Sequence, residues 1–569
     1  MQMRIVDFFC GAGGFSEGFR QQGFKVEMGI DNWRPAVEAH NLNFGLNDSP
    51  KSVLDFEGDV KHIEEFIPDT EIIIGSPPCV SFSMANKAGK ADKSLGIRLI
   101  EAYLRVVAVK KHKKKSILKA WFMENVPNSR NFVKENYTFN NLSLGKWAKE
   151  NKLNPNGVAL KVKLSGDILC AADYGSAQTR DRFVCGEFIA TGNFLNPVKT
   201  HRPIKEKSKL QPYITLKDIK GRMPSPYKNK SQNKFVDPNY SGLVLSPEEL
   251  TDHFYDTGVY KIEWERAKEA KVNHPFMGKM SFPEDENRPS RTIMATRSAS
   301  TREALIYKSE YKRVGNGEYR MPTIREAATL MGFPYTYQFV GGEGTKWKLI
   351  GNAVCPHMSA ALARELRKAL KLTVINQEKV DFKPMKENYL KVNNLNSSKE
   401  IEFNKPPKRG KNAKFRRHPI KAGNMTVALT NYDPLNEKAS AIGKEWFTSV
   451  FLGSGGAYKI KMITKKDSVV AKQIIEKYFS DGKDFIKSFE KKFNKNIGKA
   501  KELQEMYEQD KSTSSLLEPT KLINEIAEFI LVYAPNGEKY IFGKEKLIPK
   551  EEIPKSQLLA IYSLGKITC

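Results

Sequence analysis

The sequence is poor in cysteine and contains no long apolar run. Its six cysteines are scattered over 569 residues without a CxxC pair, which argues against a zinc ribbon or a disulfide framework and is typical of a reducing compartment. No stretch of about 20 apolar residues predicts a membrane span, and the first residues lack the basic and apolar segments of a secretion signal. We therefore expect a cytoplasmic protein, and no cluster of ligating residues predicts a metal site.

Acidic residues are scarce relative to basic ones. The chain has 65 Asp and Glu against 93 Lys and Arg, a net charge of +28 and a pI near 9.5. Such a surplus fits either a lysine-rich, solvated surface or a polyanionic partner, because neutralised phosphates release counterions. Charge alone does not separate the two. The length allows about three or four domains of ~150 residues each.

A glycine-rich turn follows the first apolar segment. Residues 5–9 show a buried-strand pattern, Cys10-Gly-Ala-Gly-Gly14 interrupts it, and Phe15, Gly18 and Phe19 follow at helical spacing. Strand, glycine turn and helix start are the layout of a nucleotide-type cofactor site. The glycines let a ligand approach the backbone, and the first helical amides favour a negative group. The alternative is a plain glycine turn in an α/β sheet.

Two acidic residues further along favour the cofactor interpretation. A second strand pattern, residues 25–30, ends at Asp31, whose carboxylate can accept both hydroxyls of a ribose. Asp59, within Gly58-Asp59-Val60, can face an adenine edge. Together these residues predict an adenosine-containing cofactor, a class that includes both NAD and S-adenosylmethionine.

One cysteine lies on an unusually rigid backbone. Cys79 directly follows Pro77-Pro78, after the apolar run of residues 72–74. Ligands of open α/β sheets bind at the carboxyl ends of the strands, and two prolines restrict the backbone there. Because a positioned thiolate is a strong nucleophile, we predict that Cys79 is catalytic.

A carboxyl group and two guanidinium groups complete one possible chemistry. Glu124 ends the strand pattern of residues 121–124, and alternation places Arg180 and Arg182 on the same side of a strand. A thiol can add to carbon 6 of cytosine while a carboxyl group at N3 relieves the charge on the ring. Carbon 5 then becomes nucleophilic enough to accept a methyl group from a sulfonium cofactor.

With these motifs the sequence resembles the C5-cytosine DNA methyltransferases, over roughly residues 4–370. Six segments match motifs of that family in its order: the cofactor loop 7–15, Pro77-Pro78-Cys79, Glu124-Asn125-Val126, the Gln178-x-Arg180-x-Arg182 motif, the bracing motif 325–334 and the last cofactor motif 351–354. One departure is Val80, where the family usually has glutamine in the loop that closes on DNA. Adenine-N6 and cytosine-N4 methyltransferases need a polar acceptor before the proline pair and an aromatic ring after it. This chain has Ser76 before the pair and Cys79 after it, so these enzymes are rejected.

The resemblance implies a fold, a cofactor and a set of site residues. The fold is α/β: a Rossmann-like S-adenosylmethionine-dependent core with an inserted target-recognition domain and a C-terminal α+β domain. The implied catalytic residues are Cys79, Glu124, Arg180 and Arg182. The implied residues of the S-adenosyl-L-methionine site are Phe9, Gly11, Ala12, Gly13, Gly14, Asp31, Asn32, Asp59, Val60, Pro77, Asn352, Ala353 and Val354.

The implied substrate is double-stranded DNA with the target cytosine flipped out of the stack. Residues 83–98, with two glycines and several lysines, fit a mobile basic lid. Near the end of the recognition segment, Thr292-Ile293 resembles the family's Thr-Leu element, and arginines such as Arg297 can read guanine or contact phosphate. The predicted DNA-binding residues are Ser81, Ser83, Lys87, Arg291, Thr292, Arg297 and Arg302.

The chain continues for nearly two hundred residues beyond the family pattern. We expect a catalytic and cofactor-binding core over 1–194, target recognition over 195–315, core completion over 316–372, a basic linker over 373–418 and an α+β domain of unassigned role over 419–569. In the last domain, residues 425–429 and 457–462 predict strands, and residues 468–479 and 520–529 predict helices. Asn536-Gly537 between two apolar segments predicts a β-hairpin.

The resemblance favours a bacterial or phage enzyme that acts as a monomer and protects DNA against a cognate restriction endonuclease. An RNA enzyme like the family's tRNA branch is one alternative, although the long recognition segment favours duplex DNA. A catalytically silent DNA-binding regulator is another, and the presence of Cys79, Glu124 and Arg182 argues against it.

Overall fold

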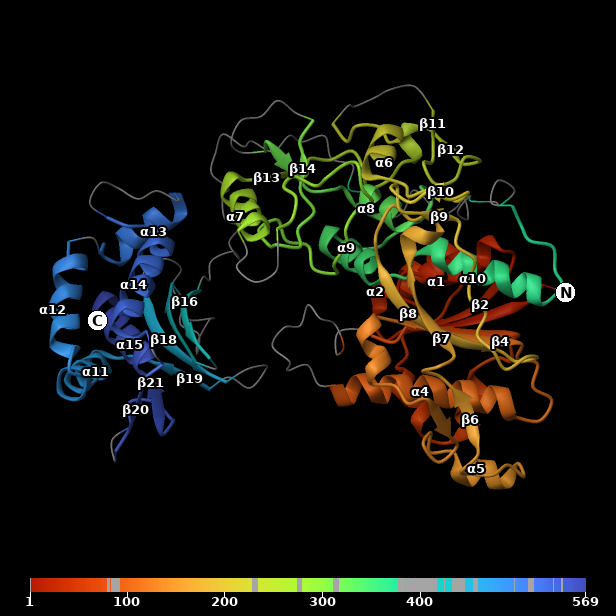
Figure 1. Ribbon diagram of the computed structural model, residues 1–569, viewed down its shortest axis with the longest axis horizontal. Coiled ribbons are helices and arrows are strands. Elements are labelled where there is room, and N and C mark those ends of the chain that lie inside the picture. The colour runs from red at the N-terminus through yellow and green to blue at the C-terminus, as the bar shows by residue number, and fades with distance from the viewer. Residues whose placement is uncertain are drawn as a thin grey trace. The chain divides into compact units, whose positions relative to one another are not determined.

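The protein is described from a computed structural model. It describes residues 2–78, 82, 93–227, 234–273, 279–310, 317–376, 380, 382, 395, 417–423, 425–431, 446–453, 459–495, 497–509, 516–535, 537–543 and 546–568. The chain divides into two compact units, Met1–Phe403 and Asn404–Cys569 (Figure 1). Among the described helices, none combines the length and apolar character needed to cross a membrane.

The first unit is organised around a six-stranded mixed sheet. Its strand order is β2-β1-β3-β4-β8-β7, with bounds β1 Arg4–Phe8, β2 Lys25–Ile30, β3 Ile72–Gly75, β4 Ala120–Asn125, β7 Gly166–Cys170 and β8 Asp181–Phe188. The first four strands in this order are parallel. β8 runs antiparallel to β4, and β7 runs antiparallel to β8. The carboxyl ends of β1, β2, β3 and β4 therefore share one edge, where ligands of such sheets bind.

Strand residues alternate between two hydrophobic cores. Ile72 and Ile74 face one cluster, and Ile73 between them faces the other, as the two-residue period of a strand requires. The first cluster includes residues of α1 (Gly14–Gln21), α2 (Arg34–Phe44) and α10 (Pro356–Ala369), and the second residues of α3 (Val60–Phe66) and α4 (Lys93–His112). Helices thus cover both faces of the sheet (Figure 1), which gives the predicted Rossmann-like arrangement.

The run of basic residues 110–115 ends α4 and is used inside the unit. Lys110 is buried and its Nζ lies 2.9 Å from the Asp69 carboxylate, and Lys111 lies 2.8 Å from Glu187. Asp69 also pairs with Lys113. These three lysines therefore bind the C-terminal end of α4 to neighbouring segments, whereas Lys114 and Lys115 are exposed.

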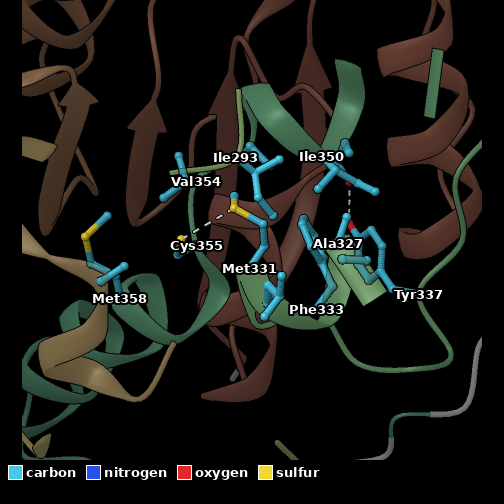
Figure 2. Close-up of a cluster of buried hydrophobic side chains, with 14 of the residues drawn as sticks. Ile293, Ala327, Met331, Phe333, Tyr337, Ile350, Val354, Cys355 and Met358 are labelled. Carbon is cyan, nitrogen blue, oxygen red and sulfur yellow. Dashed lines mark hydrogen bonds between the residues drawn. The ribbon is translucent and has the colours of Figure 1, made fainter. Parts of the chain in front are cut away.

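The rest of the first unit consists of short elements. They are η1 (Val53–Glu57), η2 (Pro127–Asn131), β5 (Asn136–Thr138), α5 (Gly145–Glu150), β6 (Val158–Lys161), η3 (Ala171–Tyr174), β9 (His201–Arg202), β10 (Gln211–Pro212), α6 (Leu216–Arg222), β11 (Phe235–Val236), β12 (Val244–Leu245), η4 (Pro247–Glu249), β13 (Gly258–Val259), α7 (Lys261–Val272), β14 (Tyr307–Lys308), β15 (Tyr319–Arg320), α8 (Ile324–Met331) and α9 (Glu343–Asn352). Figure 2 shows how Ile293 packs with side chains of α8, α9 and α10, among them Met331, Ile350 and Met358.

Residues beyond Leu372 also pack on this unit. The Gln22 side chain exchanges two hydrogen bonds with the backbone of Ile375, at 3.1 and 3.3 Å. Phe382 is buried, with its ring centroid 4.6 Å from that of Tyr240. The first unit therefore uses part of the segment that the sequence predicts as linker.

The second unit is an α+β domain. Its antiparallel sheet β16-β17-β18-β19 has the bounds Arg417–Ala422, Met425–Thr430, Phe447–Leu452 and Lys459–Met462. Its helices are α11 (Lys465–Tyr478), α12 (Gly482–Phe493), α13 (Ala500–Gln509), α14 (Pro519–Tyr533) and α15 (Lys555–Thr568), and β20 (Lys539–Ile541) pairs with β21 (Glu552–Pro554). The α+β class, both predicted strands and both predicted helices are confirmed.

The predicted hairpin around Asn536-Gly537 is wrong. Residues 531–533, expected to form its first strand, are the end of α14, and β20 pairs instead with β21. The reason is tertiary: Leu522, Ile526 and Ile530 lie at helical spacing and are buried in the core of this unit. Burial of that face outweighs the strand preference of the β-branched and aromatic residues that follow.

We expect a chain that ends at Phe403 to fold and melt cooperatively, because the core of the first unit closes within it. A chain that ends at Leu372 loses the Ile375 hydrogen bonds and the burial of Phe382, which alone stabilises by about 1.5–3 kcal/mol. Thermal denaturation followed by circular dichroism should give a lower melting temperature for the shorter chain. Equal melting temperatures would show that residues 373–403 do not stabilise the unit.

Candidate active site

The loop after β1 has the backbone of a ligand-binding turn. Phe9, Gly11 and Gly13 all have positive φ, at 55°, 54° and 90°. The Cys10 amide donates to the Ile30 carbonyl at 3.1 Å, and the Gly13 amide donates to the Cys10 carbonyl at 2.8 Å. Positive φ is strained for a residue with a side chain such as Phe9. The loop is therefore held in a tight turn between the ends of β1 and β2.

The glycines of this loop serve two different purposes. A Cβ at Gly11 would meet nothing closer than the Phe9 carbonyl at 3.9 Å, so its Cα faces open space. A Cβ at Gly13 would lie 2.6 Å from the Tyr337 hydroxyl, and one at Gly14 would lie 2.1 Å from the Val354 carbonyl. Gly11 thus leaves room for a ligand, whereas Gly13 and Gly14 are required by packing within the protein.

Asp31 connects this loop to the end of β2. Its Oδ2 accepts from the Gly11 amide at 3.1 Å and its Oδ1 from the Trp33 amide at 2.8 Å. Burial raises the pKa of Asp31 above 3.8 although both amides oppose the shift. Each carboxylate oxygen retains a further lone pair, so Asp31 is held in place and can still accept ribose hydroxyls. Asn32 beside it is exposed.

Asp59 has a structural role at the start of α3. It is the N-cap residue, and its Oδ1 accepts from the Lys61 amide at 3.0 Å. Asp59 is exposed, and Val60 after it is the first residue of the helix. Capping uses one oxygen and leaves the other available.

The last predicted cofactor motif returns to the first one across more than 300 residues. Besides the contact of Gly14 with Val354, the Tyr337 hydroxyl donates to the Ala12 carbonyl, and the Ser359 hydroxyl donates to the Phe15 carbonyl at 2.5 Å. Asn352 ends α9 and is exposed, while Ala353 and Val354 are buried. The glycine loop is therefore completed by residues from the far end of the unit.

The strand ends of β3 and β4 are joined beside the loop. The Asn125 side-chain Nδ2 donates to the Pro77 carbonyl at 3.1 Å. The Ser76 hydroxyl donates to the Phe9 carbonyl at 3.1 Å. The predicted cofactor residue Pro77 is therefore tied both to β4 and to the glycine loop. Cys79, two residues further on, lies outside the described residues.

Glu124 and Arg182 form a buried ion pair on neighbouring strands. The Arg182 Nε lies 2.9 Å from the Glu124 Oε1, and both side chains are buried. Burial raises the pKa of Glu124, and the two arginines beside it, Arg182 and Arg180, oppose that shift. Arg182 also donates to the Asp181 carbonyl at 2.7 Å. The Glu124 carboxyl group is thus fixed at the carboxyl end of β4.

Arg180 has a different task from Arg182. Its guanidinium is 3% exposed and donates to the carbonyls of Ile293 at 3.1 Å, Gly351 at 2.8 Å and Ala353 at 3.1 Å. It therefore joins three segments that are distant in sequence, among them the last cofactor motif.

The predicted DNA-binding residues that are described all have partners within the protein. Arg291 pairs with Glu284, with Nε donating to Oε2 at 2.9 Å, and Arg297 lies 2.9 Å from Glu343. The Thr292 hydroxyl donates to the Thr179 carbonyl at 3.0 Å. Arg302 lies 3.9 Å from Glu303. Ser81, Ser83 and Lys87 lie outside the described residues.

Sequence reasoning missed a buried polar chain beneath the loop. The Ser16 hydroxyl donates to Asp7 Oδ2 at 2.7 Å and lies 3.1 Å from His40 Nε2. Burial raises the pKa of Asp7 to about 8 and lowers that of His40 to about 3, so both are largely uncharged at neutral pH. No local pattern marks these residues, or Tyr337, as partners of the loop. Asn125, by contrast, lies in the Glu124-Asn125-Val126 motif, so the sequence marked the residue but not its hydrogen bond to Pro77.

Comparison with known proteins identifies the family. Residues 3–368, well over half of the chain, match the family of C-5 cytosine-specific DNA methylases. The chain belongs to the C-5 cytosine-specific DNA methylase family. It is therefore an S-adenosylmethionine-dependent DNA (cytosine-5)-methyltransferase.

Type II methyltransferase M.NgoFVII of Neisseria gonorrhoeae is 29% identical over 392 residues, which cover 67% of this chain and 89% of that protein. Type II methyltransferase M.HgiDI of Herpetosiphon aurantiacus is 27% identical over 369 residues, covering 64% and 94%. The solved structure of the Entamoeba histolytica methyltransferase EhMeth matches with 15% identity and a TM-score of 0.39, over 65% of this chain and 99% of that one.

The residues at the loop fit the cofactor of this family. Gly11 leaves open space at its Cα, and Asp31 presents a fixed carboxylate beside it. We expect Asp31→Ala to weaken S-adenosylmethionine binding by about 1–3 kcal/mol, the usual loss for a hydrogen-bond partner that is charged. Because only the ionised carboxylate accepts two hydroxyls, affinity in the unmutated protein should fall as the pH drops through the raised pKa of Asp31. Isothermal titration calorimetry measures both the loss of affinity in Asp31→Ala and the pH dependence of affinity in the unmutated protein.

Asp48→Ala is the matched control for this prediction. Asp48 also binds the backbone of β2, accepting from the Gly29 amide at 2.8 Å, but it is not a predicted cofactor residue. The Asp48→Ala variant should have a lower melting temperature and an unchanged affinity for S-adenosylmethionine. Equal losses of affinity in both variants would mean that Asp31 acts only by supporting the strand.

Proposed function

We propose that this methyltransferase modifies cytosine at carbon 5 within one specific sequence of duplex DNA and so protects that sequence from a cognate restriction endonuclease. The type II methyltransferases to which it is similar support the restriction-modification role. We further propose that it acts as a monomer, that residues 1–194 and 316–372 carry catalysis and that residues 195–315 read the target.

The junction of the Pro77 loop with Glu124 is the observation that carries this proposal. Asn125 binds the Pro77 carbonyl, and Glu124 next to it is held by Arg182. Cys79 follows Pro77 by two residues, a separation of at most about 7 Å along the chain. A thiol from that loop and the Glu124 carboxyl group can therefore act on the same base.

The four cysteines among the described residues are poor candidates for the nucleophile. Burial raises the pKa of Cys10, Cys355 and Cys185, and that of Cys170 to about 11. A thiol that stays protonated is a weak nucleophile. These values support Cys79 as the attacking residue, with Glu124 and Arg182 as its partners.

We propose that the chain's own groups activate a flipped cytosine, which costs a few kcal/mol to extrude from the stack. The Cys79 thiolate adds to carbon 6, and Glu124 hydrogen-bonds to N3, where negative charge would otherwise develop. Arg182 orients Glu124 by their ion pair. Carbon 5 thereby becomes nucleophilic. S-adenosylmethionine, when bound, would supply the methyl group to carbon 5. Loss of the carbon-5 proton to water and departure of the Cys79 thiolate from carbon 6 then restore the aromatic ring.

Bisulfite sequencing of DNA from a strain that expresses the protein tests this function directly. We expect 5-methylcytosine in a single sequence context, and none in a strain that expresses Cys79→Ala. Digestion of the same DNA by endonucleases that cut this context should then be blocked. Methylation in many unrelated contexts would contradict sequence-specific modification.

The covalent step has its own test. A duplex that carries 5-fluorocytosine at the target should form a stable adduct with the protein, and peptide mapping should locate it at Cys79. Cys79→Ser should still bind cofactor and DNA but form no such adduct. An adduct at Cys10 or Cys355, or turnover by Cys79→Ala, would contradict the proposed mechanism.

A further inference from the structure

One helix of the second unit has a lysine stripe. The buried residues of α12 are Gly482, Phe485, Ile486, Phe489 and Phe493. Lys483, Lys487 and Lys491 are exposed, and on a helical projection at 100° per residue Lys483 lies on the flank and Lys487 and Lys491 on the far side of the helix from this buried face. The helix therefore exposes lysine at three positions spaced four residues apart (i, i+4 and i+8).

No carboxylate of the described residues lies within 4.0 Å of these three lysines. Two lysines of the first unit behave differently: Lys271 and Lys346 are buried and lie 2.8 and 2.7 Å from carboxylates. The three lysines of the stripe, by contrast, form no ion pair with the described residues.

Neighbouring acidic groups are directed elsewhere. Asp484 accepts from the Tyr533 hydroxyl at 2.9 Å. Glu490 accepts from the Tyr562 hydroxyl at 3.1 Å and lies 3.4 Å from the Lys566 Nζ. Lys492, beside the stripe, packs over the ring of Phe493 at 5.1 Å. These carboxylates therefore form no ion pair with the three stripe lysines, whose ammonium groups remain exposed.

The spacing of the stripe fits a nucleic-acid backbone. Residues four apart on a helix are separated by about 6 Å along its axis. Neighbouring phosphates along one DNA strand are separated by about 3.4 Å of axis and also by the turn of the strand around it, so their direct separation is roughly 6–7 Å. Three lysines in line can thus each neutralise a phosphate with little adjustment of their flexible side chains.

We propose that the α12 lysine stripe, Lys483, Lys487 and Lys491, binds the phosphate backbone of the DNA on which the enzyme acts. The contact is independent of sequence, because phosphates carry no base information. It gives the second unit a role, as a further DNA-binding surface in addition to the methyltransferase unit. The proposal rests on the proposed function in so far as DNA is the partner.

The test is a salt titration of DNA binding by the full-length protein. A triple variant, Lys483→Gln, Lys487→Gln and Lys491→Gln, is compared with the unmutated chain on a fluorescein-labelled duplex of random sequence. The slope of log affinity against log salt should fall by about 2.7, which is 0.9 for each of three phosphate contacts, and the Kd at low salt should rise ~10-fold or more. S-adenosylmethionine affinity and the melting temperature should not change.

A second triple variant serves as the matched control. Lys521, Lys546 and Lys550 are exposed lysines of the same unit and lie outside the stripe. Their replacement by glutamine makes the same change in net charge, so it should leave the slope close to that of the unmutated protein. The sequence of residues 373–416 is the same in every variant, so a basic linker cannot account for a difference.

Two outcomes would overturn the proposal. Equal losses of slope in both triple variants would show that net charge matters and the stripe does not. An unchanged slope in the stripe variant would show that its lysines are solvated or bind something other than DNA. The outcome is independent of methylation: absence of 5-methylcytosine with the unmutated protein would refute the proposed function, whereas the salt slope would still report on the stripe.

Discussion

Most of the catalytic unit depends on the hydrogen bonds that the buried guanidinium of Arg180 donates. This group donates to carbonyls at Ile293, Gly351 and Ala353. Each hydrogen bond from a charged donor contributes about 1.5–3 kcal/mol, and a buried charge left without partners costs more. The segments around Ile293 and around residues 351–353 therefore share one anchor. Because Arg182 lies two residues further on, the same stretch of chain also holds Glu124.

The sequence predicted the local part of this arrangement well. The glycine turn and the Asp31 strand end were readable because strand, turn and helix follow one another within about thirty residues. The reason for Gly13 and Gly14 was not readable, because their neighbours Tyr337 and Val354 lie more than 300 residues away. A pattern within a window predicts an element, but it does not predict which distant element packs against it.

The same limit explains the wrong hairpin and the status of the predicted DNA contacts. Residues 531–533 have the composition of a strand, but Ile526 and Ile530 draw them into a helix by their burial. Arg297 was selected for its residue type near a recognised motif, and its pairing with Glu343 depends on where α9 packs. Whether Arg297 exchanges Glu343 for a DNA contact depends on the relative free energies of the two interactions. Amino-acid composition does not contain these free energies.

The two clusters of lysine in this chain show that density of charge is a poor guide to its use. In the dense run at the end of α4, Lys110, Lys111 and Lys113 are bound to Asp69 and Glu187. The sparser lysines of α12 are spread over the sequence, and helical periodicity gathers them on one face. Period and packing, more than run length, determine which charges face solvent.

The closure of α1 by α10 has a consequence for the protein as it is made. The Ser359 hydroxyl binds the Phe15 carbonyl across 344 positions of sequence, and a Cβ at Gly18 would collide with Pro356 and Ala360. On a ribosome that adds about 5–20 residues per second, α1 waits roughly 17 to 70 s for this partner. Until then the apolar face of α1 is covered only in part, by strand residues such as Phe122 and by Phe24. A nascent chain of this design is exposed to aggregation for most of its synthesis and gains its cofactor site only near the end of the catalytic unit.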